Sequence, residues 1–399
     1  MVKLQRREVP IGFADIGKQE RQYVMEALKN KHLSYGPFIR RFECEFAAAH
    51  NSKYGVMCNS GTSALCVSVA AAKEKFGWKN GDEVLVPAVT FVATSNVLIQ
   101  QNLKPVFVDV DPLTYNINPE EVQKHIGKRT RGIMPVHLCG LPCDMKPLME
   151  LKHSHKLTMI EDACETMFSK YMGKPIGSFG EFGCFSTYVA HILVTGVGGI
   201  ALTSDPELAI TLRSLCNHGR NGIYLSIDDD NKARGKELDM IMKKRFSFDR
   251  LGYSFRATEM EGALACAQLE RKDEILAKRR KNAAFLTAGL SDLSDVLQLP
   301  FIPAGCEHSF MFYPLVLTSP RHKRDDLTLF LEEHGIETRY LLPLINQPVY
   351  TKLYGNLEEQ YPVAANLNAN AFYVGCHQNL SEADLQHIIT AMHTFFKKR

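Results

Sequence analysis

Short apolar runs alternate with amphipathic stretches along the first half of the chain. Seven such runs have the length of buried strands, and they span residues 55–58, 83–87, 105–109, 132–136, 157–162, 183–187 and 199–203. Between them, apolar positions recur at helical spacing. Continuous apolar strands that alternate with helices are typical of a parallel sheet covered on both faces. We therefore predict an α/β fold with functional loops at the carboxyl ends of the strands.

Helical patterns flank this series of strands. Residues 15–49 have helical spacing that is interrupted at Ser34-Tyr35-Gly36-Pro37, which predicts two helices joined by an exposed loop. This loop is either a plain turn or a place where Tyr35 meets a ligand. Residues 205–217 predict another helix, and residues 257–284 predict one or two long helices rich in Ala, Leu and Glu. Residues 221–248 are polar and charged and receive no assignment.

The pattern changes at about residue 285. A strand-like stretch at 308–318 is followed by a helical stretch at 325–334, a loop with prolines at 341–348 and a helix from residue 381. We predict a mostly parallel sheet flanked by helices in a large domain of residues 1–284, and a smaller C-terminal α+β domain of residues 285–399.

Composition narrows the class of protein. The 399 residues are 45% apolar and 23% charged, with a net charge of +3, as expected of a globular protein without a nucleic-acid or membrane partner. No apolar run approaches the ~20 residues that cross a bilayer, and residues 1–10 lack a secretory core. The eleven cysteines form no zinc or cluster spacing. We predict a cytoplasmic protein without a metal.

The stretch at residues 59–65, Asn-Ser-Gly-Thr-Ser-Ala-Leu, follows the first strand and opens a helix. Free N–H groups and the dipole at a helix start bind anions, and the Thr62 side chain adds a hydroxyl. This pattern fits a phosphate group. An ordinary helix cap, in which Ser or Thr is chosen for backbone reasons, accounts for it as well.

Two further strand ends carry candidate chemistry. An acidic cluster at residues 161–165 ends a very apolar strand, and a carboxylate such as Asp162 can pair with a protonated ring nitrogen. A helix cap or an ion pair is the alternative. Phe91 follows the strand at 83–87, where it can stack on a planar ring or pack in the core.

Residues 185–199 form a polar turn between two strands and end at the glycine pair Gly198-Gly199, with His191 in the turn. An imidazole suits proton transfer near neutral pH, although a structural role is the common one for a single histidine. No lysine occurs between Lys174 and Lys232.

Taken together and in this order, these motifs resemble the sugar aminotransferase family named after DegT and DnrJ. The resemblance covers almost the whole chain from residue 11. It is carried by residues 59–65, 81–93, 105–111, 136–144, 160–165, 185–203, 252–269 and 372–377. The family implies the fold-type-I architecture of vitamin B6 enzymes and a cofactor used as pyridoxal or pyridoxamine 5′-phosphate.

The resemblance also implies roles for single residues. Gly61, Thr62 and Ser186 would hold the cofactor phosphate, Phe91 would stack on the pyridine ring, and Asp162 would pair with the ring nitrogen. Glu165 stands where many members have a glutamine near the ring hydroxyl. The site of this family lies at a homodimer interface, and Ser254 stands where many members have the asparagine that reaches into the partner's site.

The largest departure from the family concerns the lysine that binds pyridoxal phosphate covalently. Seven residues before the glycine pair, where most members have this lysine, the chain has His191. Imidazole cannot form that bond and acts only as an acid or base. A branch of the family with the same exchange comprises the 3-dehydratases of nucleotide-linked 4-keto-6-deoxy sugars, which use pyridoxamine phosphate.

Three functions follow from the resemblance. The first is a vitamin B6-dependent 3-dehydratase of a nucleotide-linked 4-keto-6-deoxyhexose in deoxysugar and surface-polysaccharide synthesis, with His191 as acid and base. The second is a nucleotide-sugar aminotransferase with glutamate as the amino donor. The third is an inactive member that binds a nucleotide sugar or a partner subunit. Tyr35, Arg339 and Asn346 are candidate substrate contacts.

Overall fold

The computed structural model describes residues 6–220, 233–244 and 246–397. A seven-stranded sheet forms the centre of the larger part of the molecule, in the order β1-β9-β8-β5-β4-β2-β3. Its strands are β1 (Tyr54–Cys58), β2 (Glu83–Pro87), β3 (Lys104–Val108), β4 (Thr130–Ile133), β5 (Thr158–Asp162), β8 (Phe182–Ser186) and β9 (Gly199–Thr203). All seven predicted strands therefore form, each within three residues of its predicted bounds.

One strand departs from the predicted parallel order. β9 pairs antiparallel with both β1 and β8, whereas the pairs β2·β3, β2·β4, β4·β5 and β5·β8 are parallel. The connection of residues 187–198 between β8 and β9 contains no helix. Parallel neighbours need a crossover of a dozen or more residues that is usually helical, and this segment instead folds back as a turn.

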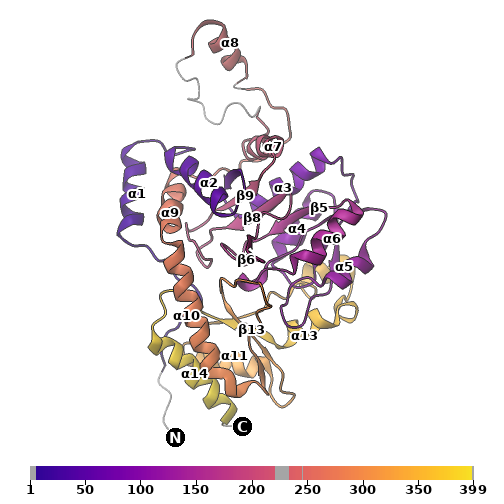
Figure 1. The fold of residues 1–399 in the computed structure, drawn as a ribbon, viewed down its shortest axis with the longest axis vertical. Helices are drawn as coiled ribbons and strands as arrows, with labels where there is room; N and C mark the ends of the chain where they lie inside the picture. The colour runs from indigo at the N-terminus through magenta and orange to yellow at the C-terminus, as the bar shows by residue number, and fades with distance from the viewer. Residues whose placement is uncertain (1–5, 221–232, 245, 398–399) are drawn as a thin grey trace.

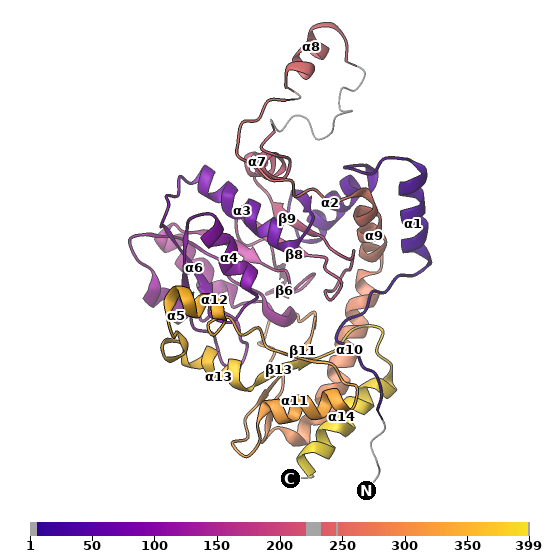
Figure 2. The same cartoon turned by 180° about the vertical axis from the view of Figure 1, so that it is seen from behind.

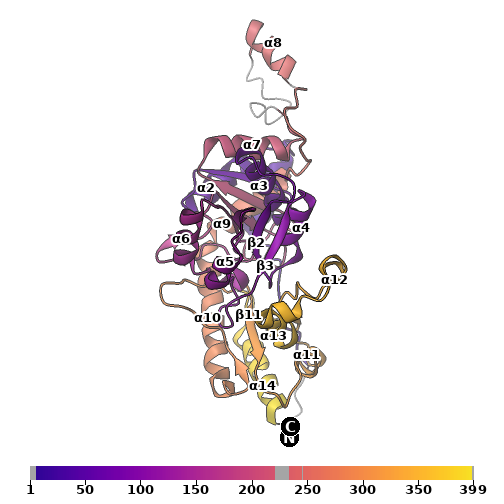
Figure 3. The ribbon, with the colours of Figure 1, turned by 90° about the vertical axis from the view of Figure 1, so that its right-hand side faces the viewer.

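Helices cover both faces of the sheet (Figure 3). The helices that precede the C-terminal part are, in chain order, α1 (Lys18–Lys29), α2 (Pro37–Ala49), α3 (Gly61–Lys75), α4 (Val92–Gln100), α5 (Pro119–His125), α6 (Met145–His155), α7 (Pro206–Cys216), α8 (Gly235–Lys244), α9 (Glu259–Glu270) and α10 (Lys272–Leu290). Their starts follow ordinary capping rules: Asn118 and Asp205 cap α5 and α7, and each cap precedes a proline. α8 lies apart from the rest of the molecule (Figures 1 and 2).

The C-terminal part has a four-stranded antiparallel sheet in the order β10-β11-β13-β12. It contains β10 (Leu297–Gln298), β11 (Tyr313–Leu317), β12 (Thr338–Tyr340) and β13 (Ala371–Val374), with α11 (Arg324–Glu333), α12 (Pro348–Tyr354), α13 (Pro362–Asn370) and α14 (Glu382–Lys397). The remaining pair is β6 (Lys170–Tyr171) and β7 (Lys174–Pro175). α10 runs without a break through residue 284, and the two-domain division stays a prediction.

The first described residues of the chain lie against the C-terminal part (Figure 1). Val9 forms a parallel bridge with Ile336, and the side chain of Glu337 accepts a hydrogen bond from the Ile11 amide at 3.0 Å. Within the described ranges, no helix combines the length and apolar character needed to span a membrane.

Candidate active site

A cavity of about 350 Å³ lies where the carboxyl ends of the sheet strands meet the C-terminal part. This is the edge at which parallel α/β sheets bind ligands, and the volume is typical of a small-molecule site. Seven of the predicted site residues line it: Gly61, Thr62, Phe91, Asp162, Glu165, Ser186 and His191. The fold therefore brings these seven residues together from four strand ends and the turn after β8.

One end of the cavity is the start of α3. Ser60 caps this helix by accepting a hydrogen bond from the Ser63 amide at 3.0 Å, which leaves the amides of Gly61 and Thr62 without an acceptor among the described residues. A methyl group on Gly61 would lie 2.7 Å from Ser186 Cβ. This close approach places the Ser186 side chain beside the free amides, and the combination suits a phosphate group.

Asp162, the last residue of β5, provides a buried carboxylate. It accepts hydrogen bonds from the Thr94 hydroxyl at 2.8 Å and from the Cys164 amide at 3.2 Å. Burial raises the pKa of Asp162, and no cation pairs with it in the described part of the chain. A protonated ring nitrogen would supply the missing positive charge.

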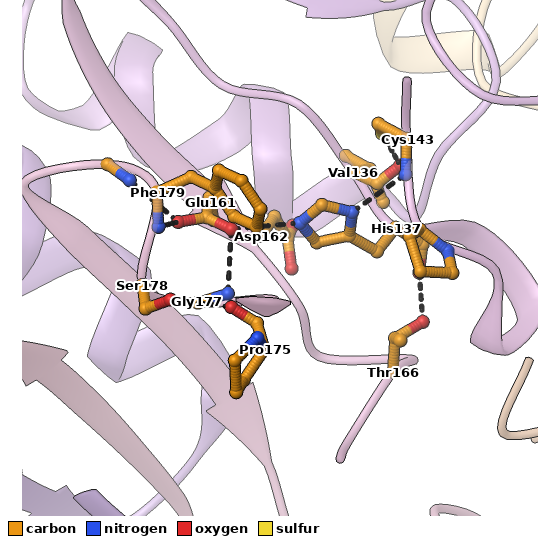
Figure 4. A network of polar contacts seen from close by, with 12 residues as sticks. Val136, His137, Cys143, Glu161, Asp162, Thr166, Pro175, Gly177, Ser178 and Phe179 are labelled. Atoms are coloured by element: carbon orange, nitrogen blue, oxygen red, sulfur yellow. Dashed lines mark hydrogen bonds and ion pairs between the residues drawn. The ribbon is translucent and has the colours of Figure 1, made fainter. Parts of the chain in front are cut away.

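The preceding residue of the strand, Glu161, fixes the backbone behind this carboxylate (Figure 4). Its carboxylate accepts hydrogen bonds from the amides of Gly177 and Phe179 at 2.6 and 2.7 Å, and it lies 3.2 Å from Nε2 of His137. The Cys143 amide donates to Nδ1 of His137 at 3.0 Å, so Nε2 carries the proton and donates to Glu161. Since successive side chains on a strand point to opposite faces, this network holds β5 while Asp162 faces the cavity.

His191 lies in the turn after β8 with its side chain half-buried. Nδ1 lies 2.6 Å from the carbonyl oxygen of Cys164. A carbonyl only accepts, so Nδ1 must carry a proton, and the neutral ring then has a free lone pair on Nε2. Burial lowers the pKa of His191 to about 4, with a smaller effect of the Arg279 charge in the same direction. The imidazole is therefore a neutral base at neutral pH.

Arg279 of α10 holds the His191 turn in place. Its guanidinium donates to the carbonyl oxygens of His191 at 3.2 Å, Met311 at 2.9 Å and Phe310 at 3.2 Å. The side chain is only 2% exposed, and each of these bonds spans more than thirty residues of sequence. The sequence analysis missed Arg279 because its three acceptors are backbone carbonyls. Every residue has such a carbonyl, so no motif in the sequence marks these contacts.

Glu165 and Phe91 complete the predicted set. The Cys139 amide donates to Glu165 at 2.9 Å, and burial raises the pKa of this carboxyl to about 7. Phe91 is 56% exposed although it lines the cavity. A large apolar ring left open in this way is suited to stacking on a planar ligand.

The other four predicted residues lie outside the cavity of their own chain. The Tyr35 hydroxyl donates to Glu43 at 2.9 Å, so it is used within the fold. Arg339 lines a separate surface hollow beside Glu332, and Asn346 is exposed. Ser254 is also exposed and accepts a hydrogen bond from Arg256 at 3.2 Å. Ligand contacts by these four residues stay predictions.

The C-terminal part contributes lining residues that the sequence analysis did not select. They are Met311, Phe312, Leu342 and Tyr373. In the sequence they belong to apolar segments whose pattern predicts a strand or a loop and gives no sign of a binding site. Their place beside the cavity depends on where the fold sets the C-terminal part relative to the strand ends of the larger sheet.

The residues present fit pyridoxal or pyridoxamine phosphate. Free amides and hydroxyls at the start of α3 suit the phosphate, the unpaired carboxylate of Asp162 suits the ring nitrogen, and the open ring of Phe91 suits the pyridine face. The usual lysine has no counterpart, since no lysine lines the cavity within the ranges described.

Comparison with known proteins places this geometry in a family. The family model described as DegT/DnrJ/EryC1/StrS aminotransferase family matches residues 14–393. GDP-perosamine synthase of Caulobacter vibrioides is 33% identical over 94% of this chain and 94% of its own length. The dTDP-4-dehydro-2,6-dideoxy-D-glucose 3-dehydratase of Saccharopolyspora spinosa is 30% identical over 96% of this chain and 86% of its own.

A solved structure supports the same placement. GDP-4-keto-6-deoxymannose-3-dehydratase with a trapped PLP–glutamate geminal diamine superposes with a TM-score of 0.85 at 26% identity, and the match covers 96% of this chain and all of the other. The fold and family that the sequence motifs predict are both confirmed. The chain belongs to the DegT/DnrJ/EryC1/StrS aminotransferase family.

Proposed function

We propose that this vitamin B6 enzyme is a 3-dehydratase of a nucleotide-linked 4-keto-6-deoxyhexose that uses pyridoxamine phosphate. One observation carries the proposal. His191 occupies the turn in which the family resemblance expects the lysine, and no lysine of the described chain replaces it at the cavity. A covalent bond to pyridoxal phosphate needs a primary amine, whereas elimination from a pyridoxamine adduct needs only a base.

The residues of the site divide this work. When bound, the cofactor supplies the amine that condenses with the 4-keto group and a ring that accepts electrons. The carboxylate of Asp162 keeps the ring nitrogen protonated, and the amides of Gly61 and Thr62 hold the phosphate. Nε2 of His191 would remove a proton from C4′, the carbon that bears the amine of the bound cofactor, and the electrons would expel the hydroxyl at C3 of the sugar. Hydrolysis would then return the cofactor as pyridoxal phosphate and release ammonia, so the cofactor amine supplies the two electrons of the deoxygenation. Nδ1 of His191 stays bound to the Cys164 carbonyl, which keeps the imidazole ring oriented. The product would be a 3,6-dideoxy-4-keto sugar.

The aminotransferase is the second candidate, and it has support of its own. The relative that is 33% identical is named GDP-perosamine synthase, and the names of the relatives favour an aminotransferase more than a dehydratase. Such an enzyme would transfer the amino group of glutamate to the 4-keto sugar. It would need an amine to release the product, and the described cavity offers an imidazole instead. An inactive member that only binds a nucleotide sugar is the third alternative.

Borohydride reduction separates the candidates. Purified protein is incubated with pyridoxal phosphate and reduced, and its intact mass and peptides are then measured. We expect no covalent adduct on the wild-type protein and an adduct at residue 191 in the variant His191→Lys. A reduced adduct on a lysine of the wild-type protein would overturn the dehydratase and leave the aminotransferase.

Turnover then tests the reaction itself. Protein loaded with pyridoxamine phosphate is mixed with GDP-4-keto-6-deoxymannose or dTDP-4-keto-2,6-dideoxyglucose, and products are identified by mass spectrometry. A deoxygenated ketone that is lighter than the substrate by one oxygen atom, formed together with pyridoxal phosphate and ammonia, supports the proposal. An amino sugar as product supports the aminotransferase, and retention of both substrate and cofactor unchanged supports the inactive member.

The proposal includes a cytoplasmic homodimer. Ser254 and the neighbouring Leu251, which is 98% exposed, lie on a segment outside the cavity of their own chain, as a contribution to a partner's site requires. Light scattering of the loaded enzyme, together with the variant Leu251→Glu, measures this: we expect a dimer mass for the wild type and a weakened dimer for the variant. A monomer mass at enzymatic concentrations would contradict the shared site.

A further inference from the structure

Tyr373 is the one tyrosine that the C-terminal sheet contributes to the cavity wall, among the described residues. It lies in β13, directly opposite Arg339 of β12 in the antiparallel register. Its side chain is only 7% exposed. The strand therefore carries this residue to the cavity as a fixed part of the smaller sheet.

The ring of Tyr373 has little freedom to turn away. It stacks on the ring of Phe312 with centroids 4.1 Å apart and planes at 20°. Phe312 itself lines the cavity. Stacked rings held between two strands keep their rotamers, so the position of the hydroxyl is defined before any ligand arrives.

The hydroxyl of Tyr373 has no hydrogen-bond partner within the described residues. Comparable tyrosines of this chain are satisfied: the hydroxyl of Tyr313 bonds with Thr287 at 2.8 Å, and that of Tyr350 donates to Asn96 at 2.7 Å. The hydroxyl oxygen of Tyr373 itself is not fully buried, so it is open to the cavity, where a ligand group or water supplies the hydrogen bond that the fold does not. Since Tyr373 lines the cavity, the partner it awaits belongs to what fills the cavity.

The charges around Tyr373 define which kind of bond it makes. Burial raises the pKa of Tyr373, and the carboxyl of Glu165 raises it further, so the hydroxyl keeps its proton and acts as a donor. The polar groups of the cofactor are already matched by the start of α3, by Asp162 and by Glu165. An oxygen of the second ligand, the substrate, remains for Tyr373.

We propose that Tyr373 is a substrate-contacting residue whose hydroxyl donates a hydrogen bond to an oxygen of the hexose ring. This assignment rests on the proposed action on a nucleotide-linked hexose. It makes the smaller sheet the side of the cavity that recognises the sugar, while the ends of the larger sheet hold the cofactor.

The test compares Tyr373→Phe with the matched control Tyr313→Phe, a buried tyrosine on the neighbouring strand that lines no part of the described cavity. Protein loaded with pyridoxamine phosphate is titrated by calorimetry with GDP-mannose, dTDP-glucose, UDP-glucose and CDP-glucose, and then with the matching nucleoside diphosphate. For the sugar nucleotide that the wild type binds, we expect Tyr373→Phe to raise Kd about tenfold, which is typical of one lost hydrogen bond. Kd for the nucleoside diphosphate and for pyridoxamine phosphate should stay within twofold, and Tyr313→Phe should leave all three values unchanged.

The outcomes separate this inference from the function on which it rests. An unchanged Kd for the sugar nucleotide in Tyr373→Phe would overturn the contact while leaving the dehydratase intact. A weaker affinity for pyridoxamine phosphate or for the nucleoside diphosphate alone would also overturn it, because the hydroxyl would then serve another group. If the wild type binds none of the four sugar nucleotides, the proposed function fails together with this contact.

Discussion

The protonation of His191 gives a prediction that can be worked through from the structure. Its Nδ1 proton is engaged by the Cys164 carbonyl, and burial lowers its pKa to about 4. The group must be neutral to act as a base. His191 should therefore stay neutral, and the rate should stay undiminished, at pH values far below the one at which an ordinary histidine becomes protonated.

The size of the effect follows from the two pKa values. At pH 5.5, a histidine with a pKa of about 4 is about 97% neutral, whereas one with the usual value of about 6.5 is only about 9% neutral. The fraction of active base thus differs about tenfold at this pH. The acid limb of kcat/KM, which reports the free enzyme, should lie near pH 4.

The assay is single-turnover dehydration of GDP-4-keto-6-deoxymannose, well below saturation, by enzyme loaded with pyridoxamine phosphate, between about pH 3.5 and 8. Glu165 also titrates in this range, because burial raises its pKa to about 7. The variant Glu165→Gln removes that titration, so the acid limb of its pH profile reports His191 by itself. The variant His191→Asn can still donate to the Cys164 carbonyl, and it should lose activity by about 10²- to 10⁴-fold.

Two results would refute this reasoning. An acid limb near pH 6.5 in both the wild type and Glu165→Gln would mean that the imidazole is not shielded from water as the structure indicates. Unchanged turnover in His191→Asn, with the fold confirmed by circular dichroism, would remove His191 from the reaction.

Three further predictions concern other residues of the site and the core. Asp162→Asn should weaken binding of pyridoxamine phosphate about tenfold or more, since a charge-assisted hydrogen bond is lost. Without cofactor, this variant should unfold at no lower denaturant concentration than the wild type, because a buried unpaired charge is removed. Gly61→Ala places a methyl group 2.7 Å from Ser186 Cβ and should lower the free energy of unfolding by about 1–3 kcal/mol. His50, whose pKa burial lowers to about 4, should make folding less stable as pH falls from about 6.5 to 4, by up to about 3 kcal/mol, because only the unfolded chain takes up the proton.

Each of these has a control. Asp162→Asn fails as a prediction if titration gives the wild-type Kd for the cofactor. For Gly61→Ala, the matched variant is Gly127→Ala, where the nearest atoms to an added methyl are 3.9 Å away; equal unfolding curves for the two variants would contradict the close packing. For His50, urea unfolding of the wild type and of His50→Gln at several pH values isolates the contribution, and parallel pH profiles would exclude it.

The sequence by itself determined the elements of this protein. Most strands of the large sheet are runs of mainly apolar residues bounded by polar turns. A helix cap likewise acts on the residues next to it, as Ser60 does at the start of α3. Such signals act over a few residues, so they can be read along the chain. The positions of Gly61, Asp162 and His191 at strand ends follow from the same local pattern, and the sheet then gathers them at one edge.

Some local predictions missed because the signal was short or was overridden. The strand expected at residues 308–318 forms only as β11 (Tyr313–Leu317), since the preceding residues hydrogen-bond with other segments: the Ser309 amide donates to the Gly140 carbonyl at 2.9 Å. The helix α12 starts at Pro348, the last residue of the predicted loop, and α13 starts at Pro362 in a stretch that received no assignment. Residues 221–232, which begin the stretch without an assignment, lie outside the described residues.

Only the tertiary structure decided how the site is supported and what faces the substrate. Arg279 binds the backbone of His191 from 88 residues away, and Tyr373 reaches the cavity because β13 pairs with β12 and packs beside the larger sheet. The pKa values of His191 and Glu165 are set mainly by burial, which depends on atoms brought together from the whole chain. Desolvation and contacts to backbone carbonyls leave no trace in the order of residues, whereas turns, caps and apolar runs are properties of neighbours along the chain.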